Sequence, residues 1–170
     1  MRTRGIAAVS ILCLVLPVAG LAQGFNQGDK EILLNGAGVS ENDFDSNAFS
    51  IEGSFGYFFT KNFEGALRQS LNLNSVEGSG SSWNGNTRGA LDFHFDMGRF
   101  WPFVGGNLGY TYGDDIADTW TVGLEGGLKF FVNASTFVMG RIEYDWLLND
   151  KDDAFSDATW VYVVGIGFRW

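Results

Sequence analysis

With 170 residues and a formal charge of −9, the chain is long enough for one domain and too acidic to bind nucleic-acid phosphates. Its 16% of aromatic residues and its 24 glycines, against two prolines, exclude a disordered acidic chain. Cys13 is the only cysteine, so no disulfide within the chain can stabilise the fold.

The N-terminal end has the pattern of a secretory signal peptide. Arg2 and Arg4 precede the apolar stretch "IAAVSILCLVLPVA", and "AGLA" supplies small residues before a cleavage site at Gln23. We therefore expect residues 1–22 to be the signal peptide and residues 23–170 to be one mature domain. Loss of the two arginines with the leader would lower the formal charge from −9 to −11. No later uncharged run reaches the roughly 18 residues of a membrane helix, so a membrane crossing would use strands.

From residue 30 onward, the chain is a succession of runs in which apolar and polar residues alternate with the period of a strand. The run at 30–40 ("KEILLNGAGVS") does not decide which of its faces is apolar. The next seven runs each have one clearly apolar face and lie at 49–59, 63–73, 87–96, 102–112, 120–130, 138–148 and 158–170. Each is about the length with which a tilted strand crosses a bilayer.

The charges of these seven runs all fall on the face opposite the apolar one, which helical spacing would not produce. The charged face carries Glu52, Glu64, Arg68, Arg88, Asp92, Asp96, Glu125, Lys129, Arg141, Glu143, Asp145 and Arg169.

The connections alternate between short turns and longer polar loops. The turns are expected at 60–62, 97–99 and 133–135, and the loops at 40–47, 74–86, 113–119 and 149–158. Short turns at one end and long loops at the other are typical of an up-and-down membrane barrel. The predicted loops are acidic, and their acidic residues include Asp114, Asp115, Asp118, Asp150, Asp152 and Asp153.

Alternation alone does not say which face points outward, because a soluble lipocalin-like barrel would turn the apolar face inward. The apolar face, however, holds too many aromatic rings for the narrow interior of eight strands. The rings also gather near the ends of the runs, as the aromatic girdles at two membrane interfaces do. We therefore predict an all-β fold, an eight-stranded antiparallel up-and-down transmembrane β-barrel, closed because hydrocarbon does not tolerate an open sheet edge.

Glycines on the apolar face are expected either beneath neighbouring aromatic rings or at bends, where they would relieve strain. They are Gly53, Gly65, Gly89, Gly106, Gly126 and Gly140.

The leader, the alternating runs and the final run "WVYVVGIGFRW" resemble the small bacterial outer-membrane barrels of the OmpA/OmpX and opacity-adhesin type. The resemblance implies export by a Sec-type route to the outer membrane of a Gram-negative bacterium, among lipid and lipopolysaccharide. It also implies a C-terminal strand that the barrel assembly machinery reads, although many members end in Phe rather than Trp. The residues that match this assembly signal are Tyr162, Val164, Ile166, Phe168 and Trp170.

The charged face allows two interpretations, a structural network of ion pairs that fills a narrow interior or the lining of a narrow, porin-like channel. We favour the ion pairs. His94 lies between two aspartates on this face, but no nucleophile motif accompanies it, so we expect a buried histidine with its hydrogen bonds made rather than a catalytic base. A single histidine and no mature cysteine leave little for a metal site, and we expect neither metal nor other cofactor.

For function, the sequence favours a non-enzymatic and monomeric barrel. Its role would be envelope integrity, or surface recognition and adhesion, with the acidic loops contacting a host or surface ligand. A narrow channel for small solutes or ions, and a lipid A-modifying enzyme, are the alternatives. The acidic loops allow two further interpretations. They bind divalent cations weakly, together with anionic lipopolysaccharide, or they are simply solvated by water.

Overall fold

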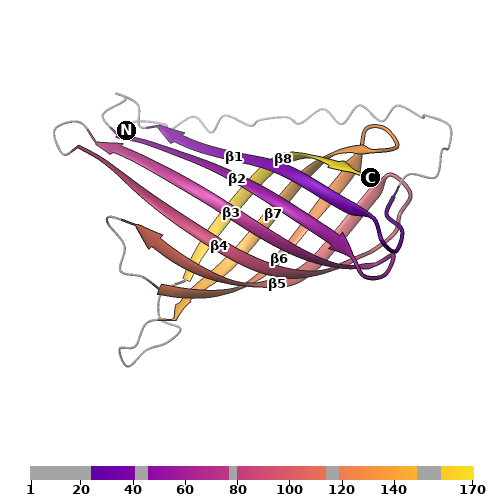
Figure 1. The fold of residues 1–170 in the computed structure, drawn as a ribbon. Helices are drawn as coiled ribbons and strands as arrows, with labels where there is room; N and C mark the ends of the chain where they lie inside the picture. Colours follow the sequence, from indigo (N-terminus) through magenta and orange to yellow (C-terminus); the bar gives the residue numbers. More distant parts are fainter. Residues whose placement is uncertain (1–23, 41–45, 77–79, 114–118, 149–157) are drawn as a thin grey trace, which may run out of the picture.

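In a computed structural model, residues 24–40, 46–76, 80–113, 119–148 and 158–170 are described, and they form eight strands (Figure 1). The predicted signal peptide, residues 1–22, lies outside the described residues. The strands are β1 (Lys30–Ser40), β2 (Ser46–Phe58), β3 (Phe63–Val76), β4 (Gly80–His94), β5 (Phe100–Gly113), β6 (Thr119–Phe131), β7 (Thr136–Leu148) and β8 (Ala158–Arg169).

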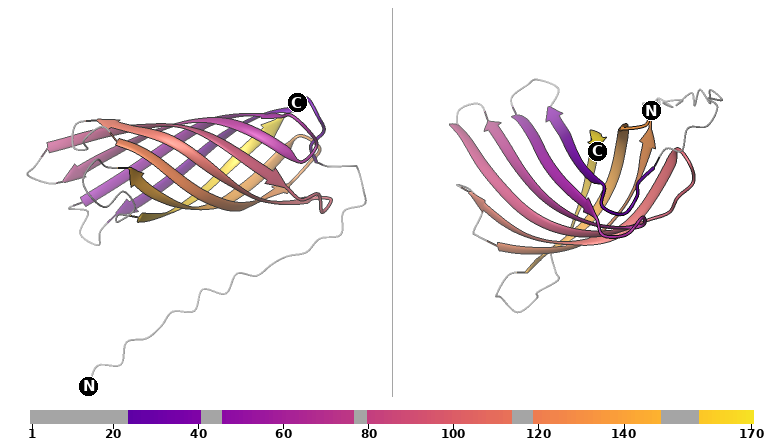
Figure 2. Two further views of the ribbon diagram at one scale, coloured as in Figure 1. Left: turned by 90° about the horizontal axis from the view of Figure 1, so that it is seen from below. Right: turned by 45° about the vertical axis from the view of Figure 1, so that its right-hand side comes forward.

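Each strand pairs with its neighbours in the sequence, and β1 pairs with β8, so that the sheet closes into a barrel. All of these pairings are antiparallel, as the prediction requires. The tilted strands wrap around a common axis (Figure 2). The C-terminal residue Trp170 exchanges backbone hydrogen bonds with Lys30, and its neighbour Arg169 donates to Ser135 in the β6–β7 turn. The end of β8 therefore lies at the turn end of the barrel.

The seam between β1 and β8 is shorter than the other pairings. Its register runs from Glu31 with Arg169 to Gly36 with Val164, whereas β3 and β4 are paired along almost their full lengths. Beyond the seam, residues 37–40 of β1 pair with β2 and residues 158–163 of β8 pair with β7. Residues 37–40 of β1 and 158–163 of β8 are therefore paired on one side only in this register.

The outer surface is apolar, so the face predicted to contact lipid does point outward. Large side chains such as Leu67, Leu124 and Val164 have 60%, 62% and 69% of their surface exposed. In water such a surface would be a large unpartnered apolar patch, but in hydrocarbon it is the favourable one. The barrel is thus built to span a membrane.

Aromatic rings gather at both ends of this surface. At the turn end Phe100 and Phe130 lie with their ring centroids 5.0 Å apart. At the loop end the rings of Tyr144 and Trp160 are 4.6 Å apart, and those of Tyr110 and Trp120 are 5.2 Å apart. These are the two girdles that the sequence predicts, at positions where amphipathic rings favour a membrane interface.

One prediction is wrong in detail. The predicted loop 74–86 is largely strand, because β3 continues to Val76 and β4 begins at Gly80. The pairing continues where Asn74 pairs with Ser82 and Ser75 with Ser81, and there the sequence no longer alternates between apolar and polar residues. Of the six glycines predicted on the apolar face, only Gly65 lies beneath a ring, that of Phe59.

The other five of these six glycines have no described aromatic ring within 4 Å of the position of an added Cβ atom, whereas Gly85, which also faces outward, lies beneath the ring of Tyr112. The register explains this, because aliphatic residues flank them: Gly89, for example, pairs with Leu67 and Leu108.

The buried apolar core sits at the turn end of the interior, around a residue that precedes the first strand. Phe25 is 1% exposed and stacks on Phe58, with ring centroids 3.9 Å apart. Trp101, Phe131 and Phe137 surround it edge-on at 5.2–5.7 Å. The N-terminal segment thus folds back into the barrel and forms a plug of packed rings, which we call the aromatic plug. No helix among the described residues is long and apolar enough to cross a membrane.

Candidate functional site in the barrel interior

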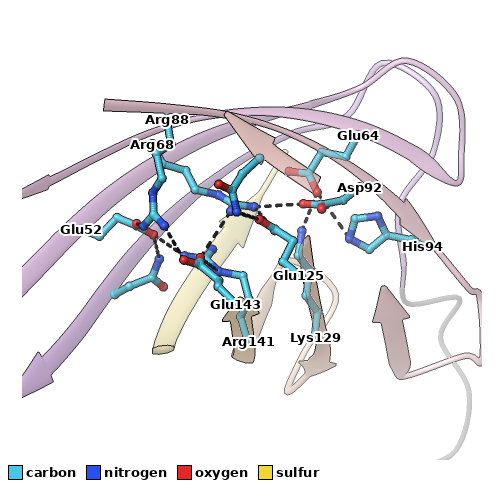
Figure 3. Close-up of polar contacts among 12 residues, drawn as sticks. Glu52, Glu64, Arg68, Arg88, Asp92, His94, Glu125, Lys129, Arg141 and Glu143 are labelled. Carbon is cyan, nitrogen blue, oxygen red and sulfur yellow. Dashed lines mark hydrogen bonds and ion pairs between the residues drawn. The ribbon is translucent and has the colours of Figure 1, made fainter. Parts of the chain in front are cut away.

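Charged side chains fill the interior between the aromatic plug and the loop end, and they form three groups that follow one another along the barrel axis (Figure 3). Alternation dictates this arrangement, because every second residue of a strand must face inward. Glu64, Lys129 and His94 lie at one end of the network and Glu52 and Arg88 at the other.

The turn-end tier is centred on Lys129, which is 3% exposed. Its Nζ donates to Glu31 at 2.7 and 2.8 Å and to Glu64 at 2.8 Å. The ammonium also faces the rings of the aromatic plug, 5.0 Å from the centroid of Phe25 and 5.4 Å from that of Phe58. Carboxylates on one side and ring faces on the other compensate a cation that burial has stripped of water.

The middle tier is built on Arg68. Its guanidinium donates two hydrogen bonds to Glu125, at 2.8 and 2.7 Å, and one to Asp92 at 3.0 Å. The amide of Asn107 donates to Glu125 at 3.0 Å and to Asp145 at 3.3 Å, which links this tier to the next. The bidentate pair fixes the planes of both groups, as is usual for arginine with a carboxylate.

The upper tier holds two arginines and three carboxylates. Arg88 contacts both Glu52 and Glu143, and Arg141 donates to Glu52 at 2.8 Å. Asp145 is less well compensated, since its nearest cation is Arg88 at 3.5 Å. Its side chain, 15% exposed, is also the most accessible of the five.

Each tier contains one carboxylate more than it has cations. Lys129 faces two carboxylates, Arg68 faces two of its own, and the two arginines of the upper tier face three. The excess carboxyl groups are therefore distributed evenly along the interior rather than concentrated at one point.

Inward glycines make room for these side chains. A Cβ atom added at Gly105 would overlap the carboxylate of Asp92, and one added at Gly123 would overlap that of Asp145. The same relation holds for Gly56 beneath Glu64, Gly109 beneath Arg88 and Gly165 beneath Asn35. Small and large residues thus alternate across neighbouring strands, which lets long charged side chains pack inside eight strands.

Free space is distributed unequally along the axis. The cavity between the lower two tiers is about 10 Å³, close to the space of a single water molecule. Above the upper tier lies a cavity of about 340 Å³, which we call the vestibule. Its floor and walls include Glu52, Arg88, Asp145, Ser50, Ser70, Asn72, Leu147, Val161 and Val163. Within the described residues, the interior is therefore packed below the vestibule.

The structure brings ten of the predicted charged residues into this network and places two elsewhere. Asp96 lies beyond the end of β4, is exposed, and pairs with Lys61 at 2.6 Å. The prediction was wrong for Asp96 because side chains alternate between the two faces only within a strand, and β4 ends before this residue. Arg169 lies at the turn end, where it pairs with Asp29 at 2.6 Å.

The Asp96 turn is a small electrostatic unit of its own. The Lys61 ammonium and the backbone N–H of Gly98 both donate to the carboxylate, which holds the pKa of Asp96 below its usual value. The Lys61–Asp96 pair belongs to a solvent-exposed turn and is not part of the three tiers.

Glu31 is the charged interior residue that the sequence analysis missed. It is 1% exposed and belongs to β1, whose two faces could not be told apart from "EILLNG". Leu33 faces inward with it, while Ile32 and Leu34 face lipid with 53% and 56% exposure. No signal in the sequence identified Glu31, because its partner Lys129 is 98 positions away and reaches it only through closure of the sheet.

His94 is fully buried at the turn end, between the rings of Phe58 and Phe103 at 5.2 and 5.1 Å. Its Nε2 lies 3.4 Å from a carboxylate oxygen of Glu64. Among the described residues neither ring nitrogen has a side-chain or backbone hydrogen-bond partner of good geometry, so the expectation that its hydrogen bonds are made stays a prediction. Ring packing against the aromatic plug, rather than hydrogen bonding, decides the position of this side chain.

The remaining predicted residues fall in two groups. Tyr162, Val164, Ile166, Phe168 and Trp170 all face outward with 47–69% exposure. Asp114, Asp115, Asp118, Asp150, Asp152 and Asp153 lie outside the described residues, so the structure does not place them. In the part of the chain that is described, no group of three or more His, Cys, Asp or Glu side chains is arranged to hold a metal ion.

These features define a small closed β-barrel with an apolar outer band and a charged, packed interior. Among solved structures, the chain is similar to the outer membrane protein OprG from Pseudomonas aeruginosa, with 17% sequence identity and a TM-score of 0.57 over 87% of this chain and 98% of that one. It is also similar to the N-terminal β-barrel domain of Pseudomonas aeruginosa OprF, with 19% identity and a TM-score of 0.57 over 85% and 98% of the two chains.

Neisserial surface protein A is a third such structure, with 15% identity and a TM-score of 0.56 over 86% of this chain and 98% of that one. No protein-family model matches the chain, and no curated protein matches its sequence. At these identities the likeness concerns the fold, and for the fold it confirms the resemblance to small outer-membrane barrels.

Proposed function

We propose that the chain is a monomeric, non-enzymatic protein of a Gram-negative outer membrane that acts through its loop end, in envelope integrity or surface recognition. The observation that supports this most directly is the packed interior. The three charged tiers and the aromatic plug fill the barrel beneath the vestibule, so a solute would have to displace buried ion pairs to pass. Exchange with the surroundings is thereby restricted to the surface and the loop end.

The proposed orientation places the short turns and the end of β8 in the periplasm and the loops outside. The acidic sequence of the loops suits a surface that contacts ligands through solvated charge, and lipopolysaccharide would surround the apolar band. We also propose that residues 1–22 direct export and are removed. In the same way, we infer that the outward residues at the end of β8, Phe168 and Trp170 among them, are read by the assembly machinery.

Localisation and surface display can be tested in one experiment. The full chain, with an epitope inserted within 149–157, is produced in a Gram-negative host, and outer-membrane fractions and intact cells are probed. We expect the protein in the outer membrane and the epitope on the cell surface. The variant Trp170→Asp should give neither, whereas Asp96→Asn, which also changes the charge by one unit at the same end, should give both. A soluble or inner-membrane product would contradict the proposal.

The absence of enzymatic activity is tested separately, by mass spectrometry of lipid A from cells with and without the protein. We expect identical acyl patterns. A protein-dependent change in the pattern would replace the proposed role with lipid A modification.

A further inference from the structure

We propose that the vestibule binds a short aliphatic amine, with its ammonium group at Asp145 and its methylene groups against β7 and β8. The inference deepens the proposed function, because it gives the loop end a ligand class, and it rests on that proposal only for access from outside the cell. Binding to the purified barrel does not depend on orientation or localisation.

The vestibule has the size of a small-molecule site. Its volume of about 340 Å³ lies at the lower end of the range for ligand pockets, roughly 300–1,000 Å³. The upper tier closes it from below, so a ligand that enters from the loop end stops at Glu52, Arg88 and Asp145. A ligand of a few carbon atoms fits this space.

The charge at the floor favours a cation. Asp145 lies 3.5 Å from Arg88, but Arg88 makes closer contacts with Glu52 and Glu143. Of the three tiers, each with one excess carboxylate, the upper one alone contributes its charges to the vestibule among the described residues. A cation beside Asp145 would balance this tier without breaking any ion pair that is already made.

The polar groups of the floor and wall suit an ammonium better than a metal ion. Asp145 is the one carboxylate there that is not already held at close range by arginine, whereas calcium takes six to eight oxygen ligands, usually with several carboxylates. An ammonium needs three acceptors. The carboxylate of Asp145 and the oxygens of wall residues such as Ser70 and Asn72 are of the right kind and face the same cavity.

The β7–β8 wall, on which Asp145 itself lies, favours methylene groups. Leu147 of β7 and Val161 and Val163 of β8 line the vestibule, and Val163 is 8% exposed. A polar solute such as a simple sugar would leave these side chains without an apolar partner, while the chain of an aliphatic amine would cover them. The strongly acidic sequence of the loops would further raise the local concentration of cations at the entrance.

The test is calorimetric titration of the folded mature protein in detergent micelles with 1,4-diaminobutane. The uncharged analogue 1,4-butanediol serves as the ligand control. We expect saturable binding of the diamine and at least about tenfold weaker binding of the diol. The variant Asp145→Asn should weaken diamine binding at least about tenfold, a loss of the size expected when one charged partner is removed. Asp96→Asn removes a carboxylate at the opposite end and should leave binding unchanged.

A second variant tests the cavity independently of charge. Ser50→Leu places an apolar side chain in the vestibule wall and should abolish binding, while heat-modifiable gel migration verifies that each variant is a folded barrel. Equal binding to the wild type and to Asp145→Asn would overturn the proposal, and so would equal binding of diamine and diol. Failure of the localisation experiment with intact calorimetric binding would instead reject the proposed cellular role and leave this site standing.

Discussion

Replacement of Lys129 by methionine tests the charged interior at its most buried point. The change keeps an unbranched apolar stem and removes the ammonium that Glu31 and Glu64 share at 2.7–2.8 Å. Both carboxylates are 1% exposed and would be left without a cation. Breaking a buried pair in this way costs about 3–5 kcal/mol, and loss of the cation–π contacts with the plug acts in the same direction. We therefore expect the free energy of unfolding to fall by about 3–5 kcal/mol.

The assay is equilibrium unfolding by urea in lipid vesicles, followed by tryptophan fluorescence and heat-modifiable migration. Lys61→Met, at a lysine whose side chain is 53% exposed, is the matched control and should change stability by less than about 0.5 kcal/mol. Adding Glu31→Gln and Glu64→Gln to Lys129→Met should recover most of the loss, because no uncompensated charge remains. A single Lys129→Met variant within about 1 kcal/mol of the wild type would refute the reasoning.

Phe25→Ala should lower the unfolding free energy by about 3–5 kcal/mol in the same urea assay, because it empties the centre of the aromatic plug; an unchanged midpoint would show that the N-terminal segment does not hold the barrel. Gly105→Ala should cost about 1–3 kcal/mol because its methyl group overlaps a buried carboxylate, while Gly140→Ala, with open space around it, should be close to neutral. Because the pKa of Asp96 is lowered in the folded turn, its pair with Lys61 stabilises the protein above the ordinary carboxyl range near pH 4 and ceases to do so as the pH falls through the lowered pKa. Urea titrations at pH 7 and pH 3 should therefore show a pH-dependent contribution below about 1 kcal/mol that Asp96→Asn lacks.

The sequence was sufficient for the strands and their faces wherever a strand crosses the apolar band. Lipid on one side and packed charge on the other impose a period of two that no helix would reproduce, as at Ile51, Glu52 and Phe55. Where that contrast ends, the prediction failed. The upper parts of β3 and β4 stay paired without an alternating sequence, and at Asp96 the strand has already ended.

The partners of the interior residues could not be predicted, because they depend on register and on the relative height of strands far apart in the sequence. Lys129 and Glu31 are separated by 98 positions, and only closure of the sheet brings them to one level. The glycines beneath Glu64, Arg88, Asp92 and Asp145 follow from the same register. Phe25 gave no signal at all, since a single aromatic residue before the first strand has no periodicity and its place is decided by tertiary packing alone.

The central claim, a membrane barrel whose interior is closed beneath the vestibule, is tested most directly by electrical recording from the purified protein in planar lipid bilayers. The account predicts insertion, verified by heat-modifiable migration of the reconstituted protein, without steady conductance steps, because buried ion pairs and the aromatic plug occupy the path. Stable, reproducible conductance steps of the wild-type protein would contradict it.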